Sequence, residues 1–216
     1  MILSFVFIGT LSAQGLGFGI KGGVNMSKLV GDDVEELSED IGDVKFLPGF
    51  AAGGFATMPI FYPLEIRVEA LYSQNGVKYY GSEGFVEGSL SMKMNWLNVP
   101  VLVGINVIPN IRVFAGPYFD LFLSGKTKMF LSYESEVIID EEEDIDSDDI
   151  KSLVVGFVAG AALGITDNIE LELRMSRGLG TIDKEPKDWD DSFEAYEESD
   201  IKPNVYQLLI NFYLKK

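Results

Sequence analysis

Strict alternation of apolar and polar residues over long stretches is the feature that most constrains the fold of this chain. In the segment LEIRVEALYS, residues 64–73, every second residue from Leu64 to Tyr72 is apolar, and the residues between them include Glu65, Arg67 and Glu69. A period of two places successive side chains on opposite faces of a β-strand. The charged face then looks either at water, as in a soluble sheet, or at the lumen of a membrane barrel.

The same alternation recurs in eight segments, most of them longer than the strands usual in soluble sheets. They are residues 15–27, 47–58, 64–79, 90–106, 111–131, 152–165, 169–179 and 203–214. The connections after the second, fourth and sixth segments are short and rich in turn residues, whereas those after the first, third, fifth and seventh are long. This asymmetry is typical of outer-membrane proteins, and it predicts an all-β fold, an eight-stranded antiparallel up-and-down transmembrane β-barrel.

The later segments show what each face of this barrel would carry. In residues 169–176 the apolar row alternates with Glu170, Glu172 and Arg174, and in LVVGFVAGAALGI, residues 153–165, large residues alternate with small ones. Small residues on some strands facing large ones on others would fill a narrow barrel. A phase slip near Trp96 and Leu97 predicts a β-bulge in the fourth segment.

Aromatic residues collect near the segment ends. They are Phe61 and Tyr62 at a short turn, and Tyr72, Tyr79, Tyr80, Trp96, Phe130 and Tyr133 toward the long loops. This distribution would suit two interfacial girdles, although aromatic residues are common in any β protein.

Acidic residues are concentrated in the long connections. The chain holds 34 acidic and 17 basic residues, a formal net charge of −17, and the acids gather in residues 28–46, 134–149 and 181–202. Nucleic-acid binding depends on Lys and Arg neutralising phosphates, so we expect no nucleic-acid partner.

The chain contains neither cysteine nor histidine. Disulfides, thiolate nucleophiles and histidine-based catalysis are therefore excluded. Carboxylate-only catalysis stays open, but nothing singles out a pair of carboxylates. We expect a protein that is not an enzyme and uses no cofactor.

The amino terminus, MILSFVFIGTLSAQ, predicts a signal peptide over residues 1–13 with cleavage after Ala13, followed by one barrel domain over residues 14–216. Its apolar run is too short to span a bilayer as a helix, which takes about 20 residues. No Lys or Arg precedes the run, which departs from the usual signal pattern. No later segment is apolar for long enough to predict a membrane-spanning helix.

Six segments carry a resemblance to a known family: GFGIKGGVNMSKL, EALYSQNGVKY, NWLNVPVLVGI, VFAGPYFDLFL, LELRMSRGLG and NVYQLLINFYL. In these segments and their order the chain resembles the PorT-like small outer-membrane β-barrels, akin in architecture to OmpA- and OmpX-type barrels. The resemblance implies a bacterial outer-membrane location with both termini in the periplasm, and it brings no catalytic motif. Members are mostly of unassigned role, one branch being linked to protein secretion. The Lys215-Lys216 tail and the very acidic loops depart from the family pattern.

Charged residues on the inward rows form the candidate site. They are Lys21, Glu65, Arg67, Glu69, Arg112, Asp120, Glu170, Glu172 and Arg174. An unpaired buried charge is costly, so these groups are expected to pair across the lumen as a structural network that keeps the barrel shut. The alternative is an ion path or gate, which the narrow interior of an eight-stranded barrel disfavours.

Two further motifs have plain interpretations. DEEEDIDSDD, residues 140–149, offers carboxylates to calcium but lacks the EF-hand arrangement, so a solvated loop is favoured and no metal site is predicted. GFGIKG, residues 17–22, matches a dinucleotide-binding pattern that has meaning only between a strand and a helix. Here we expect its glycines to make room inside the first strand.

These observations favour a structural or surface-interaction role. The partners would be the lipid bilayer and an extracellular ligand, cation or protein that meets the acidic loops, and the barrel is expected to be a monomer. One alternative is a narrow channel or a transport or secretion component. Another is a soluble secreted lipocalin-like barrel that binds an apolar ligand, which requires the apolar rows to face inward.

Overall fold

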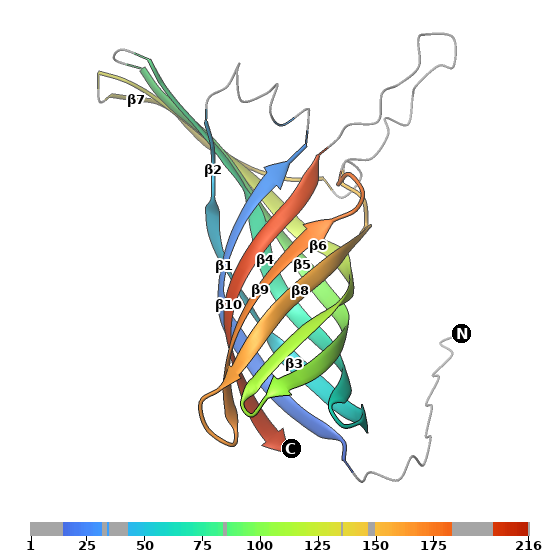
Figure 1. The fold of residues 1–216 in the computed structure, drawn as a ribbon. Coiled ribbons are helices and arrows are strands. Elements are labelled where there is room, and N and C mark those ends of the chain that lie inside the picture. Colours follow the sequence, from blue (N-terminus) through green and yellow to red (C-terminus); the bar gives the residue numbers. More distant parts are fainter. Residues whose placement is uncertain are drawn as a thin grey trace, which may run out of the picture.

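The computed structural model describes residues 15–31, 34, 43–83, 86–134, 136–146, 150–182 and 201–215. This part of the chain is a closed β-barrel with a sheet extending from one end (Figure 1). Its strands are β1 (Gly17–Val30), β2 (Asp43–Lys45), β3 (Leu47–Phe61), β4 (Leu64–Glu83), β5 (Val86–Ile108), β6 (Ile111–Tyr133), β7 (Glu136–Asp144), β8 (Leu153–Gly164), β9 (Ile169–Gly178) and β10 (Lys202–Lys215). Among the described residues, no helix has the length and apolar character needed to cross a membrane.

Eight of these strands form the ring, in the order β1-β3-β4-β5-β6-β8-β9-β10, and β10 pairs with β1 to close it. Every neighbouring pair is antiparallel. A closed ring leaves no row of unpaired backbone groups facing lipid, which is why closed barrels can span membranes. The predicted fold class is confirmed, and each of the eight predicted segments corresponds to one strand of the ring.

Three short turns lie at one end of the barrel, the turn end, at residues 62–63, 109–110 and 165–168. Asn110 has a φ of 69°, a left-handed conformation that asparagine tolerates better than most residues. The Thr166 hydroxyl accepts a hydrogen bond from the backbone N–H of Ile169 at 3.1 Å, a turn stabilised by its own side chain. β1 begins and β10 ends at the same end, as their register shows.

At the opposite end, the loop end, β4, β5 and β6 continue beyond the ring. Together with β2 and β7 they form a five-stranded sheet in the order β2-β4-β5-β6-β7, here called the extension (Figure 1). Two expectations need correction. The connection after the third segment is not a long loop, because β4 and β5 run on to Glu83 and Val86. The acidic segment after the fifth contains a strand, β7.

β7 forms because its acids lie beside lysines of β6. Lys126 Nζ is 2.5 Å from Glu142 Oε1, and Lys128 Nζ is 2.8 Å from Asp140 Oδ1. Opposite charges on neighbouring strands stabilise a sheet, so part of an acidic run that repels itself in isolation becomes ordered here.

The orientation of the two faces is that of a membrane barrel. On β9, Leu173 is 63% exposed whereas Glu172 is fully buried. Apolar residues also point outward along β8 and β10, whose inward rows carry small residues on β8 and mainly polar residues such as Gln207 and Asn211 on β10. The lipocalin-like alternative is therefore wrong, because it requires the apolar rows to line the interior.

Size complementarity fills the interior between β6 and β8. Tyr118 lies opposite Gly156 and Phe114 lies opposite Gly160 in the strand register. A Cβ atom on Gly156 would come within 2.3 Å of the Tyr118 ring. The expectation that small residues on one strand face large residues on another is confirmed here.

The expected bulge is present, but its extra residue lies on the partner strand. The β5–β6 register shifts between Asn95, which faces Ser124, and Trp96, which faces Phe122. Leu123 of β6 is thus left without a partner, and both it and Ser124 are exposed. β5 keeps its inward row through Met94 and Trp96, so the slip of phase belongs to β6.

The aromatic girdles are only partly as expected. Phe61 and Tyr62 are exposed at the turn end, and Tyr72, Tyr80 and Tyr133 are exposed toward the loop end. Tyr79 and Trp96, however, are 5% and 4% exposed and pack inside. They lie on inward rows, so they line the interior and not the lipid interface.

Candidate functional site: the interior charge network

Four strands bring together eight of the nine candidate residues. β1 supplies Lys21, β4 supplies Glu65, Arg67 and Glu69, β6 supplies Arg112, and β9 supplies Glu170, Glu172 and Arg174 through adjacent inward positions of each strand. We call these eight residues the charge network. They comprise four cations and four carboxylates, so the formal charges balance.

The middle of the barrel holds the most deeply buried part of the network. The Lys21 ammonium lies 2.7 Å from Glu69 and 2.8 Å from Glu172, and all three side chains are completely buried. Arg174 contacts the same two carboxylates, at 2.7 Å from Glu69 and 3.6 Å from Glu172. Each carboxylate is therefore shared between two cations, which compensates the cost of removing it from water.

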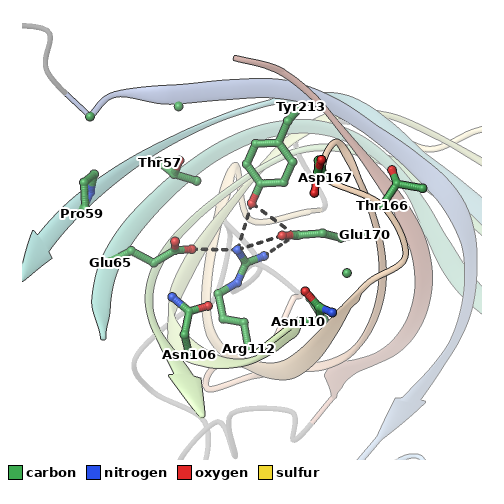
Figure 2. Close-up of a pocket in the computed structure, with 14 residues that line it drawn as sticks. Thr57, Pro59, Glu65, Asn106, Asn110, Arg112, Thr166, Asp167, Glu170 and Tyr213 are labelled. Atoms are coloured by element: carbon green, nitrogen blue, oxygen red, sulfur yellow. Dashed lines mark hydrogen bonds and ion pairs between the residues drawn. The ribbon is translucent and has the colours of Figure 1, made fainter. Parts of the chain in front are cut away.

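Nearer the turn end, two arginines complete the network. Arg112 lies 2.9 Å from Glu65 and 2.7 Å from Glu170 (Figure 2). Arg67 lies 3.4 Å from Glu172 and 3.5 Å from Glu170. Its distances to Glu65 and Glu69 are longer, at 3.9 and 4.0 Å. Arg67 thus joins the two halves of the network mainly through the carboxylates of β9.

Uncharged partners that sequence reasoning did not single out complete these contacts. The Tyr213 hydroxyl accepts hydrogen bonds from Arg67 and Arg112, and donates one to Glu170 at 3.2 Å (Figure 2). Asn211 donates to Glu172 at 2.8 Å, and Gln207 accepts from Arg174 at 2.5 Å. All three lie on the inward row of β10. That row was recognisable from the alternation, but it carries no charge to draw attention to it.

Asp120 does not join the network. Its carboxylate accepts a hydrogen bond from Asn98 at 2.6 Å, on the β5–β6 wall of the barrel. Nearer the turn end, the buried cluster on β5, β6 and the neighbouring β8 is apolar: Leu102, Phe114, Tyr118, Val158 and Ala162. Asp120 is therefore inward as predicted, but it is held by a neutral partner.

A polar pocket of about 310 Å³ opens beside the network at the turn end. Its walls include Glu65, Asn106, Arg112, Glu170 and Tyr213 (Figure 2). Arg112 and its two carboxylate partners lie among these wall residues, so the pocket borders on the ion pairs.

The part of the lumen nearer the loop end is filled by apolar side chains. This apolar cluster consists of Leu29, Val34, Val77, Tyr79, Met94, Trp96, Ile150, Val154 and Ile182. Three of its members, Val34, Ile150 and Ile182, come from outside the barrel strands. The described interior thus contains two closures in series, one ionic and one apolar.

This arrangement suits a structural role better than a catalytic one. Within the charge network every carboxylate has a cation within 3 Å, which leaves none of them poised as a lone general base. Among the described residues, no group of three or more acidic side chains is arranged to hold a metal ion. Asp140 to Asp144 of the proposed calcium segment lie in β7, and residues 147–149 lie outside the described part.

The dinucleotide interpretation of GFGIKG finds no support in the fold. These residues lie inside β1, which continues to Val30 as a strand. A Cβ on Gly19 would come within 2.2 Å of the Phe212 carbonyl oxygen and 2.6 Å of the Phe55 ring. The glycine therefore allows close packing of neighbouring strands, as expected.

A family model described as "Outer membrane protein beta-barrel domain" matches residues 12–184. Similar solved structures include Ail of Yersinia pestis, with 11% identity, a TM-score of 0.44, and coverage of 93% of this chain and 99% of that one. Neisserial surface protein A shares 9% identity, with a TM-score of 0.44 and coverage of 92% and 98%. OprG from Pseudomonas aeruginosa shares 10%, with a TM-score of 0.39 and coverage of 94% and 97%. A search of curated protein sequences found no match.

Proposed function

This chain belongs to the outer-membrane protein β-barrel domain family, and on that premise we propose that it is a non-enzymatic barrel which keeps its lumen closed and acts through its loop end. The observation that carries the proposal is the pair of closures in series. An ion crossing the barrel would have to separate Lys21 or Arg174 from buried carboxylates, and then pass the apolar cluster. Both steps are costly in a narrow interior.

Conductance in planar lipid bilayers tests the closed lumen. The purified full chain should insert without producing stepwise increases in current, whereas a general porin handled in the same way should produce them. Insertion is verified independently by flotation of the protein with vesicles. Reproducible steps from the wild-type chain would contradict the proposal and favour the narrow-channel alternative.

The loop end is the part of the molecule available for partners. The acids are concentrated in residues 28–46, 134–149 and 181–202, which all connect strands at this end. The extension adds a sheet whose last strand, β7, is acidic. Charge complementarity favours cationic partners, such as a basic protein segment.

Binding of labelled polylysine to the chain in neutral-lipid vesicles tests this charge preference, with polyglutamate as the control polymer. Polylysine should bind and polyglutamate should not. Replacing the acids at positions 140–144 by their amides should weaken binding more than replacing five acids in residues 183–191. Equal losses would show that the extension has no special role.

Several finer features belong to the same proposal. The chain is placed in the PorT-like branch, as a monomer with both termini in the periplasm and with residues 1–13 removed as a signal peptide. The resembling segments and the shared position of the β1 start and the β10 end support this assignment. Amino-terminal sequencing of the mature protein and protease access to a carboxy-terminal tag in intact cells would test the cleavage site and the orientation.

A further inference from the structure

The polar pocket at the turn end is lined by a buried hydroxyl that the charge network does not use. Thr57 is 7% exposed, yet its hydroxyl makes no hydrogen bond to another described residue. It is the only polar side chain of β3, whose inward row otherwise includes Leu47, Ala51 and Phe55. A buried hydroxyl without a partner is costly, so a hydroxyl on the wall of a pocket favours a ligand that hydrogen-bonds to it.

Two asparagine side chains lie on the same wall with their amides unpaired among the described residues. They are Asn106 of β5 and Asn110 of the turn that follows it (Figure 2). Backbone hydrogen bonds hold both residues in place: the Asn106 N–H donates to the Pro63 carbonyl at 3.1 Å, and the Asn110 carbonyl accepts from Gly164 at 2.7 Å. An amide both donates and accepts, so the pair suits a ligand that carries hydroxyl groups.

The carboxylate of Glu65 is incompletely satisfied. Arg112 donates from Nη1 to Tyr213 at 2.9 Å and from Nη2 to Glu170 at 2.7 Å. Glu65 Oε1 lies 2.9 Å from the same Nη1, but it accepts no hydrogen bond from Arg112 or from another described residue. An ionised carboxylate accepts several hydrogen bonds, so Glu65 keeps capacity for a donor inside the pocket.

The pocket is also negatively charged. Its wall contains three carboxylates, Glu65, Asp167 and Glu170, and one cation, Arg112, so the formal charge of the wall is −2. Arg67 is not part of the wall but lies 3.5 Å from Glu170, which lowers the local excess to one negative charge. Charges interact more strongly in a partly enclosed space than in bulk water, so the pocket attracts a cation.

The size of the pocket limits what it can hold. Its volume of about 310 Å³ lies at the lower end of the range for small-molecule sites, about 300 to 1,000 Å³. Gly15, Gly17 and Gly164 contribute to the wall without filling the space. This volume suits a molecule with a single ring and excludes a folded partner.

We propose that the turn-end pocket binds a small polyhydroxylated amine of the amino-sugar class. The protonated amine donates to Glu65, and the hydroxyl groups pair with Thr57, Asn106 and Asn110. Because the lumen beyond the pocket is closed, the ligand enters and leaves at the turn end. The site lies at the opposite end from the acidic connections and the extension, so it does not depend on the function proposed for them.

Calorimetric titration of the full chain in detergent tests the proposal with three sugars of one skeleton: glucosamine, glucose and glucuronate. The titrations are made at about pH 6, below the ordinary pKa range of an amine, so that glucosamine is a cation. Glucosamine should bind about tenfold or more tighter than glucose, because a charge-assisted hydrogen bond replaces a neutral one. Glucuronate, an anion, should bind more weakly than glucose.

Three variants locate the site. Thr57→Val keeps the shape of the side chain and should weaken glucosamine binding by about fivefold, the effect of one hydrogen bond. Glu65→Gln should remove most of the preference for glucosamine over glucose. Gly164→Leu should abolish binding by filling the pocket, since a Cβ there meets only Asn110, at 3.5 Å or more.

Two matched controls should bind as the wild type does. Thr127→Val removes a hydroxyl from β6 in the extension, and Gly54→Leu adds the same side chain to the outer face, where the nearest atom to a Cβ is 3.5 Å away. Heat-modifiable migration on gels verifies that each variant is folded.

The contrary outcomes are specific. Equal binding of glucosamine and glucose by the wild-type chain, or no binding of either, would overturn the proposal. Undiminished glucosamine binding in folded Gly164→Leu would also overturn it, because the ligand would then occupy another part of the molecule.

Discussion

The half of the lumen nearer the turn end is held together by ion pairs, whereas the half nearer the loop end is filled by apolar side chains. In the first half, Lys21, Glu69 and Glu172 are buried charges, and each needs an oppositely charged partner at a fixed distance and orientation. In the second half Met94 and Trp96 lie among apolar neighbours from several segments. Apolar contact is not directional, so a neighbour can shift without leaving an unpaired group.

The difference shows how one barrel can combine a specific strand register with tolerance of small changes in side-chain packing. A buried ion pair contributes little net stability compared with apolar residues of the same size, but losing one partner leaves a stranded charge. The charge network therefore excludes alternative registers, because a slip of one residue would turn its charges toward lipid. The apolar cluster supplies closure that does not depend on matched partners.

Removing one charge from the network should have the largest effect. Lys21→Met keeps the approximate length of the side chain but leaves Glu69 and Glu172 with fewer cations, which should cost about 3 to 5 kcal/mol of unfolding free energy. Equilibrium unfolding in urea with the protein in detergent measures this loss. Lys28→Met on the same strand faces outward and should change stability by less than about 0.5 kcal/mol. Equal effects of the two substitutions would contradict the contrast between network and surface.

Truncation within the apolar cluster should come second. Replacing Met94, which is 2% exposed, by alanine should lower the free energy of unfolding by about 2 to 5 kcal/mol, because the change leaves a cavity. Met94→Leu preserves volume and should cost less than about 1.5 kcal/mol. The same unfolding measurement applies. If the leucine variant were as unstable as the alanine variant, the apolar half would tolerate a change of side-chain shape as poorly as the ionic half tolerates the loss of a charge.

Adding a methyl group where β6 and β8 pack closely inside the barrel should have an intermediate effect on stability. A Cβ on Gly156 meets the Tyr118 ring at 2.3 Å, so Gly156→Ala should cost about 1 to 3 kcal/mol as the ring is displaced. The matched control is Gly54→Ala on the outer face, where the nearest atom is 3.5 Å away. That variant should unfold close to wild type. If both alanines were neutral, close packing would not limit this interior.

The smallest effect concerns the exposed ion pairs of the extension, which contrast with the buried network. The hydrogen bond from Lys126 lowers the pKa of Glu142 below its ordinary value. A lowered pKa means that the pair stabilises the β6–β7 hairpin above the ordinary glutamate range near pH 4.3, and that this contribution is lost as the pH falls through the lowered pKa.

Hydrogen exchange at several pH values, corrected for intrinsic rates, measures this loss in the β7 amides. Their protection should be constant from pH 8 to about pH 5 and should decline at lower pH. Glu142→Gln should remove most of that decline. A decline of the same size in the variant would assign the pH dependence to other acids.

Much of this fold followed from the alternation alone. A period of two is readable in one dimension, so the inward position of Glu172 and the outward position of Leu173 were predictable without knowing any partner. The closed, narrow barrel then brings the inward rows of β1, β4, β6 and β9 together across the lumen, although none of these strands are neighbours in the ring. Eight of the nine candidate charges meet for this reason.

The rest depended on information that periodicity does not carry. Asp120 has the same parity as Arg112, but it lies on a wall with apolar neighbours, and only the register shows this. Ile150 and Ile182 lie outside the alternating strands, so nothing in their neighbourhood marked them as interior. β7 was missed because its pairing with Lys126 and Lys128 is a property of two segments together.

The unpaired Leu123 decides what the upper part of β6 displays to its surroundings. Below it even-numbered residues such as Asp120 and Phe122 look inward, and above it even-numbered residues such as Lys126 and Lys128 look outward. If Leu123 paired as an ordinary strand residue, with no bulge, the stretch above it would turn to the opposite face of the sheet. The two lysines would then face the hollow side of the sheet, Met129 would be presented to the membrane surface, and the acids of β7 would lose their counterparts.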